Sequence, residues 1–361
     1  MPAGAAADPI VELPAPGLVV ARAGEHGRPL VGLLGSISGA GVLGADDLAA
    51  LPELGTLDER AGLARARIGV VGVHAVVPVA AILRVDLAEA TRLPDGAFAD
   101  DPAAAVDRLV DDASVWWRPA AYGNMVLGRQ KVPFSRFRQM DADLLEAGVV
   151  PFLVDRVAPD RRWGLSALGD LGALSYAAGA FADVDELESR AAADPSTDGI
   201  AVLAAQVQST PRAPMGRDLL ATPTTDPWWG TARVSAGLGA LYRVRYGKDR
   251  LDLSLSTQLV YQNWSIGGEL LAGTGGTATG SAHLGVTGEG SVLITDEVAL
   301  FTRGERDPEA GRWSAGGGAA FFVTRDRRNK VTLYGWLRRA TEGAADRTRG
   351  DGLVLQVQAS L

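Results

Sequence analysis

Residues 251–262 read LDLSLSTQLVYQ, and this stretch alternates between apolar and polar side chains at nearly every step. Leu251, Leu253, Leu255 and Leu259 occupy odd positions, and aspartate, serine and glutamine stand between or beside them. Successive side chains of a β-strand point to opposite faces, so this sequence predicts a strand with one apolar and one polar face.

The same alternation recurs in 229–245, 281–293 and 352–361. With weaker segments between them, it predicts about sixteen strands, an even number as in bacterial outer-membrane barrels. The expected strands lie near 28–39, 65–75, 79–90, 110–118, 124–131, 161–169, 174–183, 199–210, 229–245, 250–261, 264–272, 281–293, 297–303, 313–324, 330–340 and 352–361.

The composition excludes several classes of protein. The chain has 361 residues and no cysteine, so it has no disulfide, thiolate metal site or thiol nucleophile. Its formal net charge of −8 argues against a nucleic-acid-binding protein, which needs a basic surface. The 45 glycines are a higher share than the usual ~7% and call for an explanation.

Two architectures use alternating strands: a soluble sandwich with its apolar face inward, and an outer-membrane barrel with that face toward lipid. Short and long connections alternate, and the polar faces carry arginine, glutamate and glutamine, which favours the barrel. Seven tryptophans lie near expected strand ends, as an interfacial girdle requires: Trp116, Trp117, Trp163, Trp228, Trp229, Trp264 and Trp313. We therefore expect an all-β protein, a transmembrane antiparallel β-barrel of the bacterial outer membrane with long extracellular loops and short periplasmic turns.

The barrel is expected over 28–361, and 1–27 form an N-terminal periplasmic or leader-proximal segment. Ala5, Ala6 and Ala7 before Asp8 are typical of the end of a secretory signal, or of an alanine-rich tail. The most apolar stretch, 68–83, is shorter than the about 20 residues of a membrane-spanning helix.

Several segments resemble, in order and spacing, the phosphate-selective porin O and P family of outer-membrane channels. They are GRQKVPFS at 128–135, RRWGL at 161–165 with LSYAAGAF at 174–181, WSIGGE at 264–269, DEVALFTR at 296–303, GGAAFF at 317–322 and LQVQASL at 355–361. The resemblance implies a sixteen-stranded barrel that assembles as a homotrimer, passes small anions and uses no cofactor. Few lysines are present, so we expect at most a mild anion preference.

The resemblance also implies that the connection 132–160 bends into the barrel and narrows the channel. Lys131, at the start of this connection, is then the main candidate for a cation at the constriction. The other pore-lining candidates are Arg129, Arg136 and Arg138 near the connection, and Arg233, Arg243, Arg245, Glu269, His283 and Arg303 on polar strand faces. Facing rows of opposite charge would create a transverse field, whereas the alternative reading is a set of ordinary solvated rim charges.

The predicted function is passive diffusion of small hydrophilic solutes or ions through the outer membrane. Its partners are membrane lipid and small solutes or anions, and not nucleic acid. Two alternatives stay open: a non-conducting structural barrel, and a soluble all-β binding protein. We expect no enzyme, because Ser281 shares a strand face with His283 but lacks a nucleophile elbow.

Overall fold

The computed structural model describes residues 30–45, 61–74, 79–90, 102–120, 123–140, 150–171, 174–182, 199–209, 228–245, 249–274, 283–308, 311–323, 329–340 and 350–360. The expected segment 1–27 lies outside these residues. No helix within them is long and apolar enough to cross a bilayer.

Sixteen strands and four short helices make up the described chain. The strands are β1 (Leu30–Ala45), β2 (Ala61–His74), β3 (Val79–Asp86), β4 (Val110–Ala120), β5 (Gly123–Lys131), β6 (Arg161–Leu171), β7 (Leu174–Phe181), β8 (Gly199–Ser209), β9 (Trp228–Arg245), β10 (Arg250–Gln262), β11 (Trp264–Thr274), β12 (His283–Thr295), β13 (Val298–Asp307), β14 (Arg312–Phe322), β15 (Lys330–Ala340) and β16 (Gly350–Ser360). The helices are α1 (Leu87–Ala90), α3 (Pro102–Leu109), α4 (Arg136–Gln139) and α5 (Phe152–Val157).

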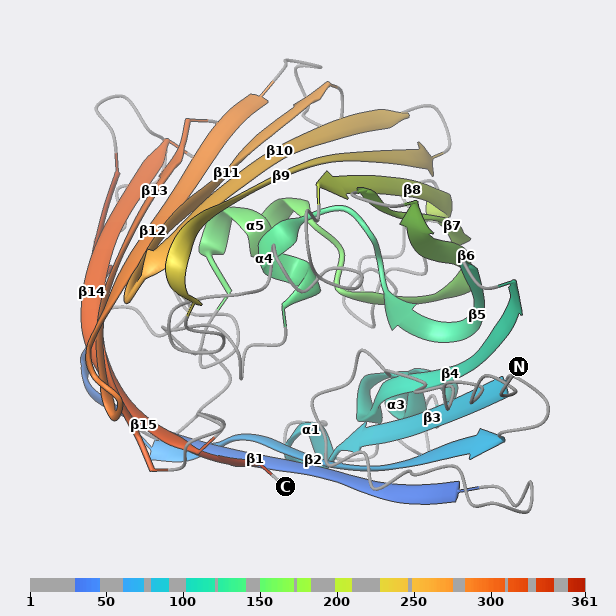
Figure 1. The fold of residues 1–361 in the computed structure, drawn as a ribbon, viewed down its shortest axis with the longest axis horizontal. Helices are drawn as coiled ribbons and strands as arrows, with labels where there is room; N and C mark the ends of the chain where they lie inside the picture. The colour runs from blue at the N-terminus through green and yellow to red at the C-terminus, as the bar shows by residue number, and fades with distance from the viewer. Residues whose placement is uncertain are drawn as a thin grey trace, which may run out of the picture.

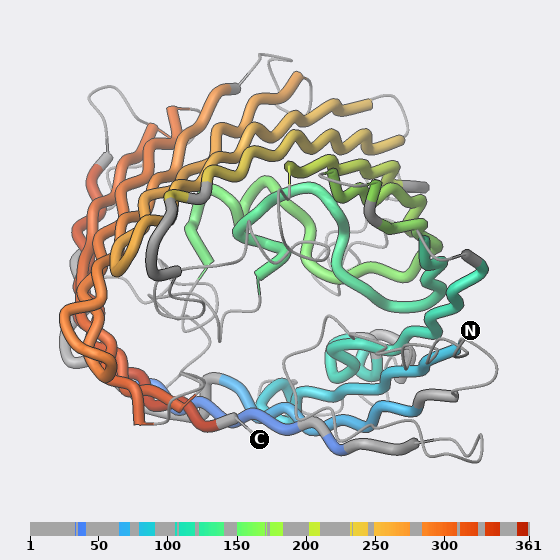
Figure 2. The backbone as a smooth tube through the Cα atoms, viewed as in Figure 1, coloured from blue at the N-terminus to red at the C-terminus, as the bar shows by residue number. Residues whose placement is uncertain are grey.

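The strands form one closed barrel in which each strand pairs with its neighbours in sequence (Figures 1 and 2). The ring closes where β1 pairs antiparallel with β16, for example Ser38 opposite Gln358 and Ala40 opposite Gln356. Closure satisfies the backbone of both end strands, which is the condition for crossing a bilayer with strands. The predicted sixteen-stranded antiparallel barrel is confirmed.

The two faces of each strand follow the alternation in the sequence. In β10, Leu251, Leu253 and Leu255 are exposed on the outside, whereas Ser254 and Ser256 are buried on the inside. At about 3.3 Å per residue and a tilt of about 40°, the outward row of β10 covers about 25 Å of membrane thickness. The apolar exterior matches the hydrocarbon core, and the protein is an outer-membrane barrel.

Exposed aromatic side chains mark both ends of this apolar belt. Trp163, Tyr242 and Trp313 lie at the end that carries the connection 132–160, and Trp117 and Trp264 lie at the other end. Trp116 does not belong to the expected girdle, because its indole Nε1 donates a hydrogen bond of 3.0 Å to Oγ of the buried Ser114. Alternation forces this difference, because adjacent residues of a strand cannot both face the membrane.

The strand expected over 79–90 ends earlier, at Asp86, where α1 begins. The Asp86 carboxylate accepts a hydrogen bond of 3.0 Å from the backbone N–H of Ala88 and one of 2.9 Å from Ala66. Capping of this kind favours a helical turn over a further strand pair. The chain continues through α3, whose Arg108 lies 3.6 Å from Glu89 of α1.

Replacing Leu255 by lysine tests the outward face. We expect Leu255→Lys to lower the free energy of unfolding in lipid vesicles by about 2–4 kcal/mol, the cost of a lysine near the membrane midplane. Denaturant titration of the refolded barrel measures this loss of unfolding free energy. Leu255→Met, which keeps the outward side chain apolar, is the matched control, and an equal loss in both variants would contradict the assignment of the faces.

Candidate functional site

The chain between β5 and β6 lies inside the barrel. Figure 1 shows α4 and α5 within the ring of strands, on the side of β9–β12. We call the described part of this connection, 132–140 and 150–160, the inner segment. The family resemblance implied that this connection bends into the barrel, and its two helices do lie inside the barrel.

Hydrogen bonds close the base of the inner segment. The Val132 N–H donates to the Asp160 carbonyl at 3.1 Å, and Lys131 Nζ donates to the Gln139 carbonyl at 2.9 Å. Burial raises the pKa of Asp160, but the charges of Arg138 and other nearby cations lower it by more, so this pKa lies below its ordinary value. Lys131 therefore lies at the mouth of the inner segment and holds its first helix in place.

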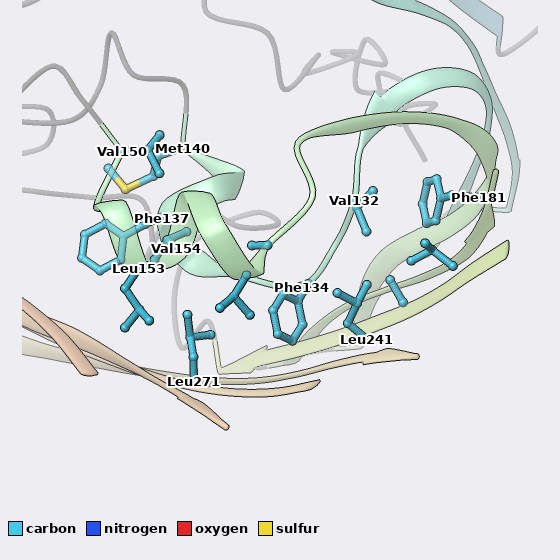
Figure 3. Close-up of a cluster of buried hydrophobic side chains, with 14 residues drawn as sticks. Val132, Phe134, Phe137, Met140, Val150, Leu153, Val154, Phe181, Leu241 and Leu271 are labelled. Carbon is cyan, nitrogen blue, oxygen red and sulfur yellow. The ribbon is translucent and has the colours of Figure 1, made fainter. Parts of the chain in front are cut away.

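Apolar side chains seat the inner segment on the wall. Phe134, Phe137 and Leu153 are fully buried and pack in one cluster with Leu241 of β9 and Leu271 of β11 (Figure 3). Full burial of such a side chain is worth about 1.5–3 kcal/mol. Both leucines occupy inward positions, where alternation predicts polar residues, and these two exceptions mark the contact.

Two wall glycines make room for this contact. A Cβ on Gly239 would lie 2.1 Å from the Phe134 carbonyl oxygen, and a Cβ on Gly285 would lie 2.5 Å from Leu153 Cδ1. At Gly239 the backbone of the inner segment therefore approaches the wall more closely than a side chain would allow, and at Gly285 the Leu153 side chain occupies the space beside the glycine. Part of the glycine excess in the sequence has this cause.

Glu269 of β11 receives the beginning of α4. Its carboxylate accepts hydrogen bonds from Ser135 Oγ at 2.8 Å, from the Arg136 N–H at 3.3 Å and from the Phe137 N–H at 3.4 Å. From the wall, Ser254 Oγ donates to it at 2.5 Å. A carboxylate at a helix N-terminus satisfies N–H groups that the helix itself leaves without partners.

Strand β13, which is separated from β11 by β12, holds α5 in the same way. Glu305 accepts a hydrogen bond from the Leu153 N–H at 3.1 Å. Asp307 receives two from Arg156, at 2.7 and 2.8 Å, in a bidentate pair. Wall carboxylates therefore fix both helices.

Further cations join the inner segment to itself and to the wall. Arg138 of α4 pairs with Asp155 of α5 at 2.9 Å, and Arg243 of β9 donates to the Val157 carbonyl. Arg303 pairs with Glu289 at 2.6 Å, and its guanidinium carbon lies 5.8 Å from the centre of the Phe137 ring. These contacts tie α4 and α5 together as one unit.

A network of ion pairs joins β2, β3, β4 and β6 next to the base of the inner segment, where Arg161 Nη1 also lies 3.4 Å from Asp160. Arg84 lies 2.6 Å from Asp111 and 2.5 Å from Asp112, and Arg67 lies 3.1 Å from Asp111. Arg161 reaches Asp112 at 2.9 Å. Alternation does not predict this network, because the charges meet only through strand register.

A column of aromatic rings lines another part of the inner wall. The Tyr334 ring centroid lies 5.8 Å from those of Phe301 and Trp336. A Cβ on Gly316 would lie 2.5 Å from the Tyr334 hydroxyl oxygen, and one on Gly352 would lie 2.1 Å from the Trp336 indole. Glycines on adjacent strands therefore let these large rings lie along the wall.

The structure brings six of the ten predicted residues to the inner segment: Lys131, Arg136, Arg138, Arg243, Glu269 and Arg303. Three of these are almost fully buried, with Arg136 1%, Glu269 2% and Arg303 4% exposed. Their contacts join the inner segment to the wall. The remaining four residues are placed by their strands. Arg129 is buried in β5. Arg233 and Arg245 belong to β9 and His283 belongs to β12, and the side chains of these three lie outside the described part of the structure.

Comparison with solved structures finds outer-membrane porins and channels. The anion-selective porin from Comamonas acidovorans superposes with a TM-score of 0.55 at 13% identity, covering 92% of this chain and 100% of that one. The outer-membrane channel DcaP of Acinetobacter baumannii superposes with a TM-score of 0.57 at 12% sequence identity, covering 92% of this chain and 97% of that one. A mutant of the Rhodobacter blastica porin superposes with a TM-score of 0.55 at 12% identity, covering 92% of this chain and 100% of that one. No family description and no curated protein matches the chain in sequence. The likeness establishes a porin-type fold.

The Glu269 anchor can be tested by truncation. In Glu269→Ala the buried donors of α4 lose their acceptor, at a cost of about 1–3 kcal/mol for each unsatisfied group. We expect the inner segment to detach locally while the barrel stays folded, so that protease cleaves within 132–160. Glu297→Ala, at an exposed turn far from the segment, is the control, and equal protection of both variants would contradict the anchoring role.

The close approach at Gly239 gives a second test. Gly239→Val places a side chain where the Phe134 carbonyl lies, so we expect the inner segment to be displaced and the conductance of single barrels to change. Gly304, where a Cβ would meet nothing within 4 Å, serves as the control position. If Gly239→Val conducts like Gly304→Val, the segment does not set the width of the channel.

Proposed function

We propose that this protein is a porin through which small hydrophilic solutes or ions diffuse passively across the outer membrane, with a mild preference for anions. The observation that carries the proposal is a closed barrel with the inner segment fixed across its interior by Glu269, Glu305 and Asp307. A segment held this firmly narrows a pore without moving as solute passes. The channel works down a concentration gradient, as neither an enzyme nor a cofactor-dependent transporter.

The preference for anions is supported by the resemblance to the phosphate-selective porin O and P family. One structural neighbour is itself described as an anion-selective porin. The same resemblance supports a homotrimer, and OmpT of Vibrio cholerae, similar in fold, is described in a trimer form. Within the chain, Lys131 at the mouth of the inner segment is the proposed selectivity cation.

A second candidate function is a barrel that conducts little or nothing. Inward side chains such as Ser254, Ser256 and Gln258 are only 1–3% exposed, which favours a narrow interior. Such a barrel would act as a structural component of the membrane. Conductance separates the two candidates.

Planar-bilayer recordings of the purified protein test the proposal. We expect stepwise conductance and, in a salt gradient, a reversal potential on the anion side. Lys131→Glu should shift that potential toward cation preference, because it replaces a positive by a negative charge at the constriction. Arg118→Glu, near the opposite barrel end, is the matched charge control.

Absence of conductance steps from folded, heat-modifiable protein would favour the structural barrel. Equal reversal potentials for Lys131→Glu and the unmodified protein would remove Lys131 from the constriction while leaving the porin proposal in place.

A further inference from the structure

The side of the inner segment that turns away from the wall carries charges of both signs. In α5, Leu153, Val154 and Val157 are fully buried and belong to the cluster that packs on the wall. The helical period therefore directs Asp155 and Arg156 away from this buried face. Because α5 lies inside the ring of strands, these two side chains face the interior of the barrel (Figure 1).

An ion pair with the wall fixes Arg156 and leaves part of it exposed. Its guanidinium forms a bidentate pair with Asp307 of β13, at 2.7 and 2.8 Å. The Asp307 side chain is only 1% exposed, whereas the Arg156 side chain is 34% exposed. Arg156 thus presents a cation to the interior in a fixed position, and the carboxylate that pairs with it lies behind it.

Asp160 shows the reverse arrangement, with its carboxylate exposed and its cations deeper. The Asp160 side chain is 44% exposed, whereas those of Arg161, at 3.4 Å, and Arg138, at 3.8 Å, are 4% and 13% exposed. Arg138 also pairs with Asp155, whose side chain is 23% exposed. We call Asp155, Arg156 and Asp160 the mixed-charge surface. Its members are close together, because even an extended chain spans at most about 14 Å from residue 156 to residue 160.

Charges of both signs at one place select against solutes that carry only one. A simple anion bound at Arg156 would lie beside the exposed carboxylate of the preceding residue, Asp155. A simple cation bound at Asp160 would lie beside Arg138. Like charges brought together in this way oppose binding. A solute that carries both a carboxylate and an ammonium group avoids both penalties, since each group meets its opposite charge.

We propose that the mixed-charge surface binds small zwitterionic solutes, such as short peptides, as they cross the barrel. The solute carboxylate binds Arg156, and the solute ammonium binds Asp160. Ion pairs within the protein hold both side chains before the solute arrives, so little side-chain freedom is lost on binding. This site rests on the proposed porin function and deepens it, because it names a class of solute.

Block of the ion current by small peptides tests the site. The purified protein in planar bilayers is titrated at constant ionic strength with glycylglycine, which carries both charges. Two analogues each lack one charge: N-acetylglycylglycine has no ammonium, and glycylglycinamide has no carboxylate. An exposed ion pair is worth a factor of up to about five in affinity. We therefore expect glycylglycine to halve the current at a concentration about two- to fivefold lower than either analogue.

Charge-removing variants separate the two contacts. In Asp160→Asn, the advantage of glycylglycine over N-acetylglycylglycine should disappear, while its advantage over glycylglycinamide remains. Arg156→Gln should give the reverse pattern, and Arg156→Lys, which keeps the charge, should retain both advantages. Asp296→Asn is the matched control, in the exposed turn between β12 and β13 at the other end of the barrel, and should behave like the unmodified protein.

Equal block of the unmodified protein by all three solutes would overturn the zwitterion site, as would an equal loss of both advantages in Asp160→Asn and Arg156→Gln. Stronger block by N-acetylglycylglycine than by glycylglycine would also overturn it, by revealing a plain anion site. Each of these results, obtained from a conducting barrel, leaves the porin proposal standing. Absence of conductance from the folded protein would overturn the porin proposal and the zwitterion site together.

Discussion

The whole structure depends on one constraint: in hydrocarbon, every backbone N–H and C=O must find its partner within the protein. For a chain of strands this demands closure, which the pairing of β1 with β16 supplies. Closure then separates the side chains into two sets, one toward lipid and one toward the interior. The near-neutral mean hydropathy of +0.08 is the average of these two sets and describes neither surface.

The same constraint acts on the inner segment, whose short helices cannot pair with a strand. Helices of four and six residues leave most of their backbone N–H groups without helical partners. The wall supplies acceptors to them as carboxylates, Glu269 for α4 and Glu305 for α5. Glycines bring the two backbones close, and leucines remove water from between them. The position of the inner segment is therefore set by the wall as much as by the loop.

Alternation in the clearest runs, together with weaker segments and turns between them, predicted about sixteen strands, because a period of two persists over many residues and needs no knowledge of neighbours. It could not predict α4 and α5, which are too short to display a helical period. The network around Asp111 also escaped, since its arginines come from β2, β3 and β6 and meet only through register. Glu269 and Arg303 were recognised as inward charges, but their role as anchors depends on a segment more than 100 positions away.

The exceptions to alternation carry the most specific information about this barrel. Leu241 and Leu271 are apolar where the pattern demands polar residues, and the inner segment covers both. Arg306 and Arg339 are charged where the pattern demands apolar residues, and strand register places each of them opposite Trp313 at one end of the apolar belt. Each exception costs free energy unless a partner compensates for it, since apolar groups avoid water and charges avoid hydrocarbon. The compensated apolar positions on the inside therefore identify where the inner segment is seated on the wall.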